Sequence, residues 1–302
     1  MAAPQPNPRQ SLGLKGLSPE AQGVVKTRKL TGNWDLKRLV RVLAELAQFD
    51  DMIVQELKSN LKQIFIWCGA TVIILIVCGN LGGAFLLLPV LSAAWVVALF
   101  RKRNGLKKMD LIDDFRICLR PALRDLASDL DPEKKIKVEM NLSGPSPDKQ
   151  TSQLELPPGR FQKLTATVFQ DPWCEIRLSL IDGSTAIIKF ENCYRKLQRR
   201  YRSRSGKTKW KTKWKKECSA SATLLPGSPA VWQEKQLEAR ISPQWEKLKF
   251  FDKEGVRGAT LEHFWLFKGA SDPPSNAPQA REVVGLLLRL HGAMGVPGEA
   301  AK

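Results

Sequence analysis

The longest apolar run of the chain constrains its fold most. From Ile64 to Phe100 the sequence contains no charged residue, and Asn80 with its neighbouring glycines interrupts the apolar side chains. A single helix of this length would be about 55 Å long at ~1.5 Å per residue, nearly twice the ~30 Å of a hydrocarbon core. The run must therefore fold back, and Asn80–Gly83 supplies turn-forming residues. The sequence predicts a transmembrane hairpin of two helices over residues 64–100.

Residues at the ends of this run indicate its orientation. Trp67 and Trp95 fall near the same end of the two predicted helices, and tryptophan favours the membrane interface. Arg101, Lys102 and Arg103 follow the second helix. By the positive-inside rule both termini are predicted to be cytoplasmic, which gives an integral membrane protein with two spans in the cell (inner) membrane. Two alternatives are a buried hairpin of a soluble protein and a wedge that does not reach the far side.

Amphipathic patterns flank the hairpin. Residues 33–63 and 101–130 each carry an apolar stripe at helical spacing and are predicted to pair as an antiparallel cytosolic stalk. Pro121 should kink the second helix or end it. The same stripes would also suit helices on the membrane surface, protein partners or a homo-oligomer seam. Residues 1–32 are predicted to form a disordered basic tail, because they are rich in Pro, Gly, Gln and Lys without periodicity.

The side-chain periodicity changes to two after Asp131. Residues 131–268 contain alternating segments separated by turn signals at Asp182-Gly183 and near Lys253–Gly255, and are predicted to form an antiparallel β domain of six or seven strands. Within it a Pro/Ser/Gln-rich loop is expected up to about Gly159, and separate strands over residues 160–169 and 174–181. A Pro-rich linker over 269–280 and a C-terminal helix and tail over 281–302 follow. The predicted fold class is an α+β membrane protein with a two-helix transmembrane hairpin, a helical stalk, this β domain and a terminal helix.

The net charge of +18 indicates a polyanionic partner such as anionic lipid or nucleic acid. Twelve Lys and Arg side chains, and no acidic one, lie between Arg195 and Lys216. This stretch contains Gly206-Lys207-Thr208, but a phosphate loop needs a further glycine five residues before Gly206, where Tyr201 stands. A β-hairpin is therefore the preferred interpretation of the segment.

A turn centred on Ser205-Gly206 predicts one register for this hairpin. It places Tyr201, Trp210 and Trp214 on one face, with the cations on the other. The predicted anion-binding residues are Lys196, Arg200, Arg202, Arg204, Lys207, Lys209, Lys211, Lys213 and Lys215. Four pairs of like charges directly opposite each other would cost about what the aromatic pairs gain, so an anionic partner would stabilise the ribbon. A slip of one residue would mix the two sets. The alternative is an edge ribbon whose lysines prevent aggregation.

The predicted partners are the lipid bilayer and its anionic lipid headgroups. A tethered domain stays close to the membrane surface, where each basic side chain contributes on the order of 1 kcal/mol. Nucleic acid ranks second, because the predicted register turns the aromatic side chains away from the cations and into the core. We expect a non-catalytic anchor, scaffold or sensor. The alternatives are a protein-binding subunit of a larger membrane complex and a membrane tether for nucleic acid.

No residue pattern points to catalysis. His263 and His291 have no partner at metal-ligand spacing, and Asp113-Asp114 is typical of a solvated helix surface. Asp171-Pro172-Trp173 is typical of a turn, with Trp173 packed in the core. The six cysteines form no CxxC pair and are expected to be free thiols. No enzyme activity, cofactor or metal is predicted.

Overall fold

The structure is a computed structural model, which describes residues 14–80, 87–157, 159, 161–228, 231–253, 255–269 and 275–295. The chain divides into two compact units, one comprising residues 1–26 and 44–111, the other residues 27–43 and 112–302. The long helix α2 (Leu36–Asn80) contributes to both units. Most of the turn predicted at 80–83 lies outside the described residues.

The N-terminal segment differs from the predicted tail. Residues 14–16 form the 3-10 turn η1 (Leu14–Gly16), followed by helix α1 (Pro19–Thr27). Ala21 and Val24 on α1 are buried, and the Ser18 backbone nitrogen donates to the Glu45 carboxylate at 3.0 Å. The buried positions are spaced so that one face of α1 packs inward. Residues 1–13 lie outside the described part of the chain.

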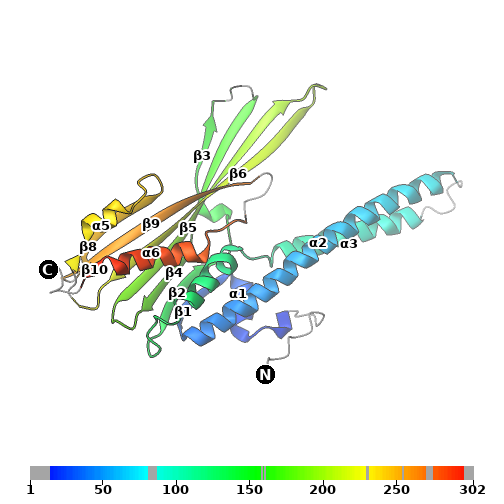
Figure 1. Cartoon of the computed structure of the whole chain (residues 1–302). Helices are drawn as coiled ribbons and strands as arrows, with labels where there is room; N and C mark the ends of the chain where they lie inside the picture. The colour runs from blue at the N-terminus through cyan, green and yellow to red at the C-terminus, as the bar shows by residue number, and fades with distance from the viewer. Residues whose placement is uncertain are drawn as a thin grey trace. The chain divides into compact units, whose positions relative to one another are not determined.

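Helices α2 and α3 (Leu87–Lys107) lie antiparallel in the first unit (Figure 1). Arg103 donates to the Leu57 carbonyl oxygen at 3.4 Å, and the rings of Trp67 and Trp95 are 6.2 Å apart. Among the described helices, α2 is the one long and apolar enough to cross a membrane, with a mean hydropathy of 2.2 over its most apolar window, of which 11% is buried. A second span is not found among them.

The prediction of a second stalk helix over residues 101–130 is wrong. Helix α3 ends at Lys107. After an irregular stretch the chain forms the short π-helix η2 (Phe115–Leu119) and the short helix α4 (Arg120–Asp125). Pro121 lies in the first turn of α4 rather than ending a helix, since proline suits the first helical turn. Apolar residues of this stripe are buried in the second unit, where α4 packs on α6 (Ala280–Gly292).

An antiparallel sheet of eight strands forms the second unit (Figure 1). Its order is β1-β2-β4-β5-β6-β9-β8, and β3 pairs with β4 beside β2. The strands of this sheet are β1 (Lys29–Trp34), β2 (Ile136–Asn141), β3 (Gln150–Leu156), β4 (Lys163–Ser179), β5 (Thr185–Arg202), β6 (Thr208–Leu225), β8 (Glu246–Lys253) and β9 (Val256–Gly269). Outside it lie a two-stranded pair, a 3-10 turn and a helix, namely β7 (Val231–Trp232) with β10 (Met294–Gly295), η3 (Pro147–Lys149) and α5 (Glu234–Ala239).

The fold is therefore α+β with a long helix and an antiparallel sheet, as predicted. Seven strands of the sheet begin within residues 131–268, where six or seven were expected, and β1 adds an eighth from outside this range. Strands β1 and β3 come from segments interpreted as a tail and a loop. Strand β4 joins two segments predicted as separate strands, through an irregularity between Pro172 and Cys174. The predicted turns near Asp182-Gly183 and before Val256 are confirmed, because β5 and β9 begin directly after them.

Helix α6 covers one face of the sheet by packing on β6 and β9 (Figure 1). The buried residues of β5 and β6 occupy even-numbered positions, among them Ile188, Phe190, Ala220 and Leu224, because alternate side chains of a strand share a face. Strands β4, β5 and β6 extend beyond this covered part. We call their outer ends, residues 163–169, 195–202 and 208–215, together with β3 and the turn 203–207, the distal sheet.

Candidate anion-binding surface

The predicted basic hairpin is present, but its register is shifted by one residue. The β5–β6 ladder runs from Thr185 opposite Leu225 to Arg202 opposite Thr208. The Ser203 nitrogen donates to the Lys207 carbonyl oxygen at 2.9 Å, which closes a loop of three residues rather than two. Gly206 has a φ of +77°, the left-handed conformation that three-residue hairpin loops require at this position.

This shift corrects the predicted separation of cations from aromatic rings. Arg200 faces Trp210 and Lys196 faces Trp214, whereas Tyr201 faces Lys209. The distal parts of β5 and β6 therefore have two mixed faces. The tryptophan face carries the even-numbered residues Lys196, Gln198, Arg200, Arg202, Thr208, Trp210, Thr212 and Trp214. The lysine face carries the odd-numbered residues Arg195, Leu197, Arg199, Tyr201, Lys209, Lys211, Lys213 and Lys215.

On the tryptophan face, cations lie over rings. The Arg200 guanidinium is 5.9 Å from the Trp210 ring centroid, and the Lys196 ammonium is 5.6 Å from that of Trp214. Trp210 is 59% exposed, so the expectation that it enters the core is wrong. Trp214 instead packs against Phe169 of β4, at 5.8 Å between centroids. Cation–π contacts of this kind contribute roughly 0.5–1 kcal/mol where they are exposed.

The lysine face combines basic and apolar side chains. Lys209, Lys211, Lys213 and Lys215 alternate along β6 and are all exposed. Two rows cross the sheet from β3 to β6 in register, Leu154–Ala166–Leu197–Lys213 and Leu156–Leu164–Arg199–Lys211. Between β5 and β6, like charges directly opposite each other fall from four predicted pairs to two, Arg199 with Lys211 and Arg195 with Lys215. The neighbouring strands add Lys163 opposite Arg200 and Lys268 opposite Lys215. Repulsion within the ribbon is therefore weaker than the sequence suggested.

The other two predicted anion-binding residues, Arg204 and Lys207, lie in the exposed turn between β5 and β6. The structure thus brings all nine predicted residues to the distal sheet, but it distributes them over two faces and a turn. Three belong to the tryptophan face and four to the lysine face.

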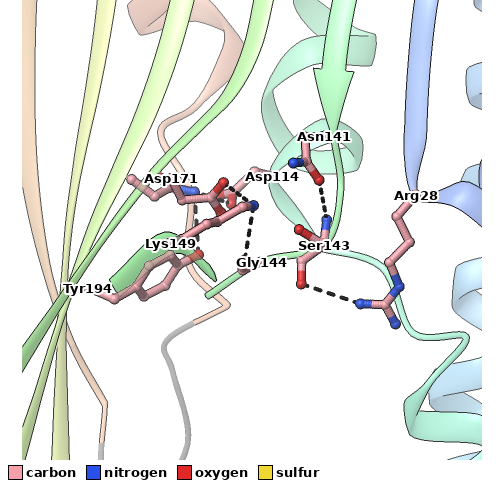
Figure 2. A network of polar contacts seen from close by, with 9 residues as sticks. Arg28, Asp114, Asn141, Ser143, Gly144, Lys149, Asp171 and Tyr194 are labelled. Carbon is pink, nitrogen blue, oxygen red and sulfur yellow. Dashed lines mark hydrogen bonds and ion pairs between the residues drawn. The ribbon is translucent and has the colours of Figure 1, made fainter. Parts of the chain in front are cut away.

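A buried polar network lies where the helix-covered part of the sheet meets the distal sheet (Figure 2). Lys216 is 1% exposed and pairs with Asp114 at 2.6 Å, while its Nζ also donates to the Asn276 carbonyl oxygen at 2.9 Å. Asn192 donates to Asp114 at 2.8 Å. Burial raises the pKa of Asp114 more than its ion pair with Lys216 and these hydrogen bonds lower it. Lys216 is therefore structural and does not contribute to an exposed basic surface.

A second buried pair adjoins the first. Lys149 contacts Asp171 at 2.5 Å and donates to the Gly144 carbonyl oxygen at 3.1 Å (Figure 2). Burial raises the pKa of Asp171 to about 6, although the hydrogen bond and charge of Lys149 act in the opposite direction. Asp171 lies within β4 rather than in a turn. Trp173 is buried as predicted and stacks on Phe190 at 5.0 Å.

The sequence interpretation missed this network. Asp114 was assigned to a solvated helix surface. Lys216 was one of the twelve cations counted between residues 195 and 216, but it was not among the nine predicted anion-binding residues. The alternation of side chains along β6 could have indicated that Lys216 is buried, because Lys216 shares its face with the buried residues Cys218 and Ala220. The partner Asp114 has no such signal, since it precedes the irregular π-helix η2.

The histidines contact carboxylates at α6 and β9. His263 and Arg289 both contact Glu246, at 3.1 and 2.6 Å. Burial acts to raise the pKa of Glu246, but hydrogen bonds from Arg289, the Ser242 backbone and His263 outweigh it and hold the pKa at about 2. His291 lies 2.9 Å from Asp182. Within the described ranges, no group of three His, Cys, Asp or Glu residues is arranged to hold a metal ion.

The predicted membrane-interface residues lie where the apolar segments of α2 and α3 approach the charged parts of these helices. Trp67 and Trp95 are adjacent, and 39% and 54% exposed. Arg101 is exposed, Lys102 lies 3.7 Å from Glu56 of α2, and Arg103 donates to α2 as described above. Each tryptophan is five or six residues from the nearest charged residue, Lys62 or Arg101, which is roughly 8–9 Å along a helix.

Comparison of the chain with protein-family models, with curated proteins and with solved structures found no match.

Proposed function

We propose that this chain is a non-catalytic membrane protein that inserts the α2–α3 hairpin into a bilayer and presents the distal sheet to anionic lipid headgroups. The observation that carries the membrane part is the outward apolar surface of both helices. Phe65, Ile73 and Val90 are 71%, 62% and 64% exposed, and their neighbours are similarly exposed. A continuous apolar surface of this kind marks a membrane or protein interaction site, whereas the core helix of a soluble protein is covered.

The depth of insertion follows from the lengths of the apolar segments. The apolar part of α3 extends from Leu87 to Phe100, about 21 Å at ~1.5 Å per residue, and that of α2 from Ile64 to Asn80, about 25 Å. Both are shorter than a ~30 Å hydrocarbon core. The proposal therefore covers a hairpin that spans the membrane and one that enters as a wedge. In both cases Trp67 and Trp95 lie at the cytosolic interface, and both termini are cytoplasmic.

A charged substitution tests insertion. Ile73→Arg should convert the protein from an integral to a carbonate-extractable form, because an arginine at the centre of a membrane helix costs about 2.5–3.5 kcal/mol. Leu288→Arg is the matched control, since Leu288 is 57% exposed on α6, and it should leave the protein integral. Extraction of the wild-type protein by carbonate would refute membrane insertion.

Headgroup binding is supported by the lysine face, where four exposed lysines of β6 lie beside the half-buried Leu197, in a row that ends at the exposed Leu154 of β3. Each basic side chain near an anionic leaflet contributes on the order of 1 kcal/mol, within a Debye length of about 8–10 Å. The full chain in zwitterionic nanodiscs should bind acceptor liposomes that contain phosphatidylserine and should not bind phosphatidylcholine liposomes. Binding should weaken steeply as salt rises. Equal binding to both liposomes would contradict this part of the proposal.

Nucleic acid is a second candidate, favoured by the exposure of Trp210 next to Arg200. A base stacked on such a ring contributes about 1–3 kcal/mol, and adjacent cations contact the phosphates. Fluorescence anisotropy with labelled single-stranded DNA, at the salt used for liposomes, compares the two candidates. Both experiments need the full chain, because β1, Asp114 and α4 all precede residue 131 and a fragment starting there would lose them.

A further inference from the structure

We infer that the distal sheet docks on anionic membranes through its lysine face, with the leucines of β3 and β4 entering the boundary between headgroups and acyl chains. This inference rests on the proposed function and deepens it, because it assigns lipid binding to one of the two faces, the one that carries six of the nine cations on the distal parts of β5 and β6. The tryptophan face is then directed away from the bilayer.

The lysine face carries more basic side chains that are free to bind an anionic partner than the tryptophan face does. Its four β6 lysines are about 6.8 Å apart along the strand and cover roughly 20 Å. Among the described residues none of these four has an ion-pair partner. From the row of Arg195 and Lys215 outward, the described part of this face carries no acidic residue. The two arginines of this face are engaged, Arg195 with Glu217 at 3.5 Å and Arg199 over the Phe161 ring. On the tryptophan face Glu155 pairs with Lys163 at 2.5 Å, and Lys196 and Arg200 lie over indole rings, so the available cations are the four lysines of β6.

The lysine face also has the apolar surface that peripheral membrane binding requires. Leu154 on the edge strand β3 is 55% exposed, and Leu156, Leu164 and Leu197 are half-buried beside it. Three strand spacings of ~4.8 Å separate β3 from β6, so leucines and lysines lie within about 14 Å of each other. One flat contact can therefore engage acyl chains and headgroups together.

The same face loses this character nearer the core. There its residues include Lys189, Glu191, Ser219 and Ser221, which are polar and of both charges. This is the composition of an ordinary solvated sheet face. The closely spaced lysines of β6 are thus confined to the part of the sheet that α6 does not cover, as expected for a surface with an anionic partner. Nearer the core the same face retains apolar surface on β9, where Leu266 is 46% exposed beside Glu217.

Two triple variants with identical net charge test the assignment. The lysine-face variant is Lys209→Gln, Lys211→Gln, Lys213→Gln, and the tryptophan-face variant is Lys196→Gln, Arg200→Gln, Arg202→Gln. In the nanodisc and liposome assay, the first should weaken binding to phosphatidylserine liposomes on the order of 10–100-fold, and the second by less than about threefold. Equal losses would overturn the face assignment while leaving headgroup binding intact. No wild-type preference for phosphatidylserine would instead refute the proposed function itself.

A leucine substitution tests the apolar contact separately. Leu154→Gln should reduce binding several-fold, mainly in the part that persists at high salt, whereas Leu288→Gln on α6 should not change it. Unchanged binding by Leu154→Gln would overturn leucine insertion. Far-UV circular dichroism checks that all variants fold, and a surface substitution of this kind changes stability by only about 0.5 kcal/mol. A further outcome would show the inference to be wrong: the tryptophan-face variant loses affinity for single-stranded DNA, while the lysine-face variant still binds both DNA and phosphatidylserine liposomes. In that case the tryptophan face is the functional surface.

Discussion

In the half of the β5–β6 pair that α6 covers, alternation separates an apolar core face from a polar outer face; in the distal half, the same alternation separates tryptophans from lysines. Ile188 and Ala222 are buried opposite each other in the first half, while Arg200 and Trp210 are exposed opposite each other in the second. One register serves both halves without a bulge.

This comparison explains why the distal register was predicted incorrectly. Charges and rings alone favoured Tyr201 opposite Trp210, but the register of a long ladder is set where a slip would expose the core. Moving β6 by one residue would turn Ala220, Ala222 and Leu224 away from α6. The distal residues therefore adopt the register that the core residues set, and a three-residue turn containing Gly206 joins the two strands in that register.

Among the predicted effects on stability, replacement of Lys216 should have the largest. It also distinguishes the helix-covered half of the β5–β6 pair from the distal half. Lys216→Met leaves Asp114 buried without its cation, so it should lower the free energy of unfolding by about 3–5 kcal/mol. Lys213→Met, three residues further into the distal sheet, should change it by less than about 0.5 kcal/mol. Denaturant titration of the nanodisc protein, followed by far-UV circular dichroism, measures both.

Its control is the double variant Asp114→Leu, Lys216→Met, which removes both charges and should recover most of the loss. Equal stabilities for Lys216→Met and Lys213→Met would show that the buried pair does not fix the boundary between the halves.

Much of the fold followed from local patterns, and the failures have physical causes. Strand β2, the turns at Gly183 and Gly255 and helix α6 carry clear periodicity or turn residues. Strand β1 is missed because it is short, contains Gly32 and pairs only with the distant β2. Strand β3 is missed because both of its faces are largely exposed, which removes the alternation of apolar residues. Of the site, its position and cations were predicted, but the distribution over two faces was not.

The free energy of unfolding should depend on pH through the second buried pair, Lys149 with Asp171. The pKa of Asp171 is raised from 3.8 to about 6 in the folded protein, so its stabilising contribution is fully present below about pH 4 and is lost as the pH rises through 6. Asp171→Asn cannot ionise. The variant should therefore gain up to about 3 kcal/mol relative to wild type between pH 4 and pH 7. Denaturant titrations at several pH values measure this difference, and a constant difference would contradict the raised pKa.

A smaller effect is expected at the tip of the ribbon. Gly206→Ala places a side chain at a φ of +77°, which costs about 1–2 kcal/mol. Because the tip is remote from the core, this should accelerate amide hydrogen exchange at residues 203 and 206 on the order of tenfold without altering global unfolding. Ser205→Ala is the control, and an equal acceleration by both would argue against the three-residue turn.

Cross-strand disulfides test the register most directly. In the reported ladder Gln198 lies opposite Thr212, within the Cα separation of about 4.4–6.8 Å that a disulfide needs. The pair Gln198→Cys, Thr212→Cys should therefore oxidise readily, and Gln198→Cys, Lys213→Cys should not, because its side chains are on opposite faces. The reverse result would place the lysines and tryptophans as the charges alone suggested and would contradict the two-faced distal sheet.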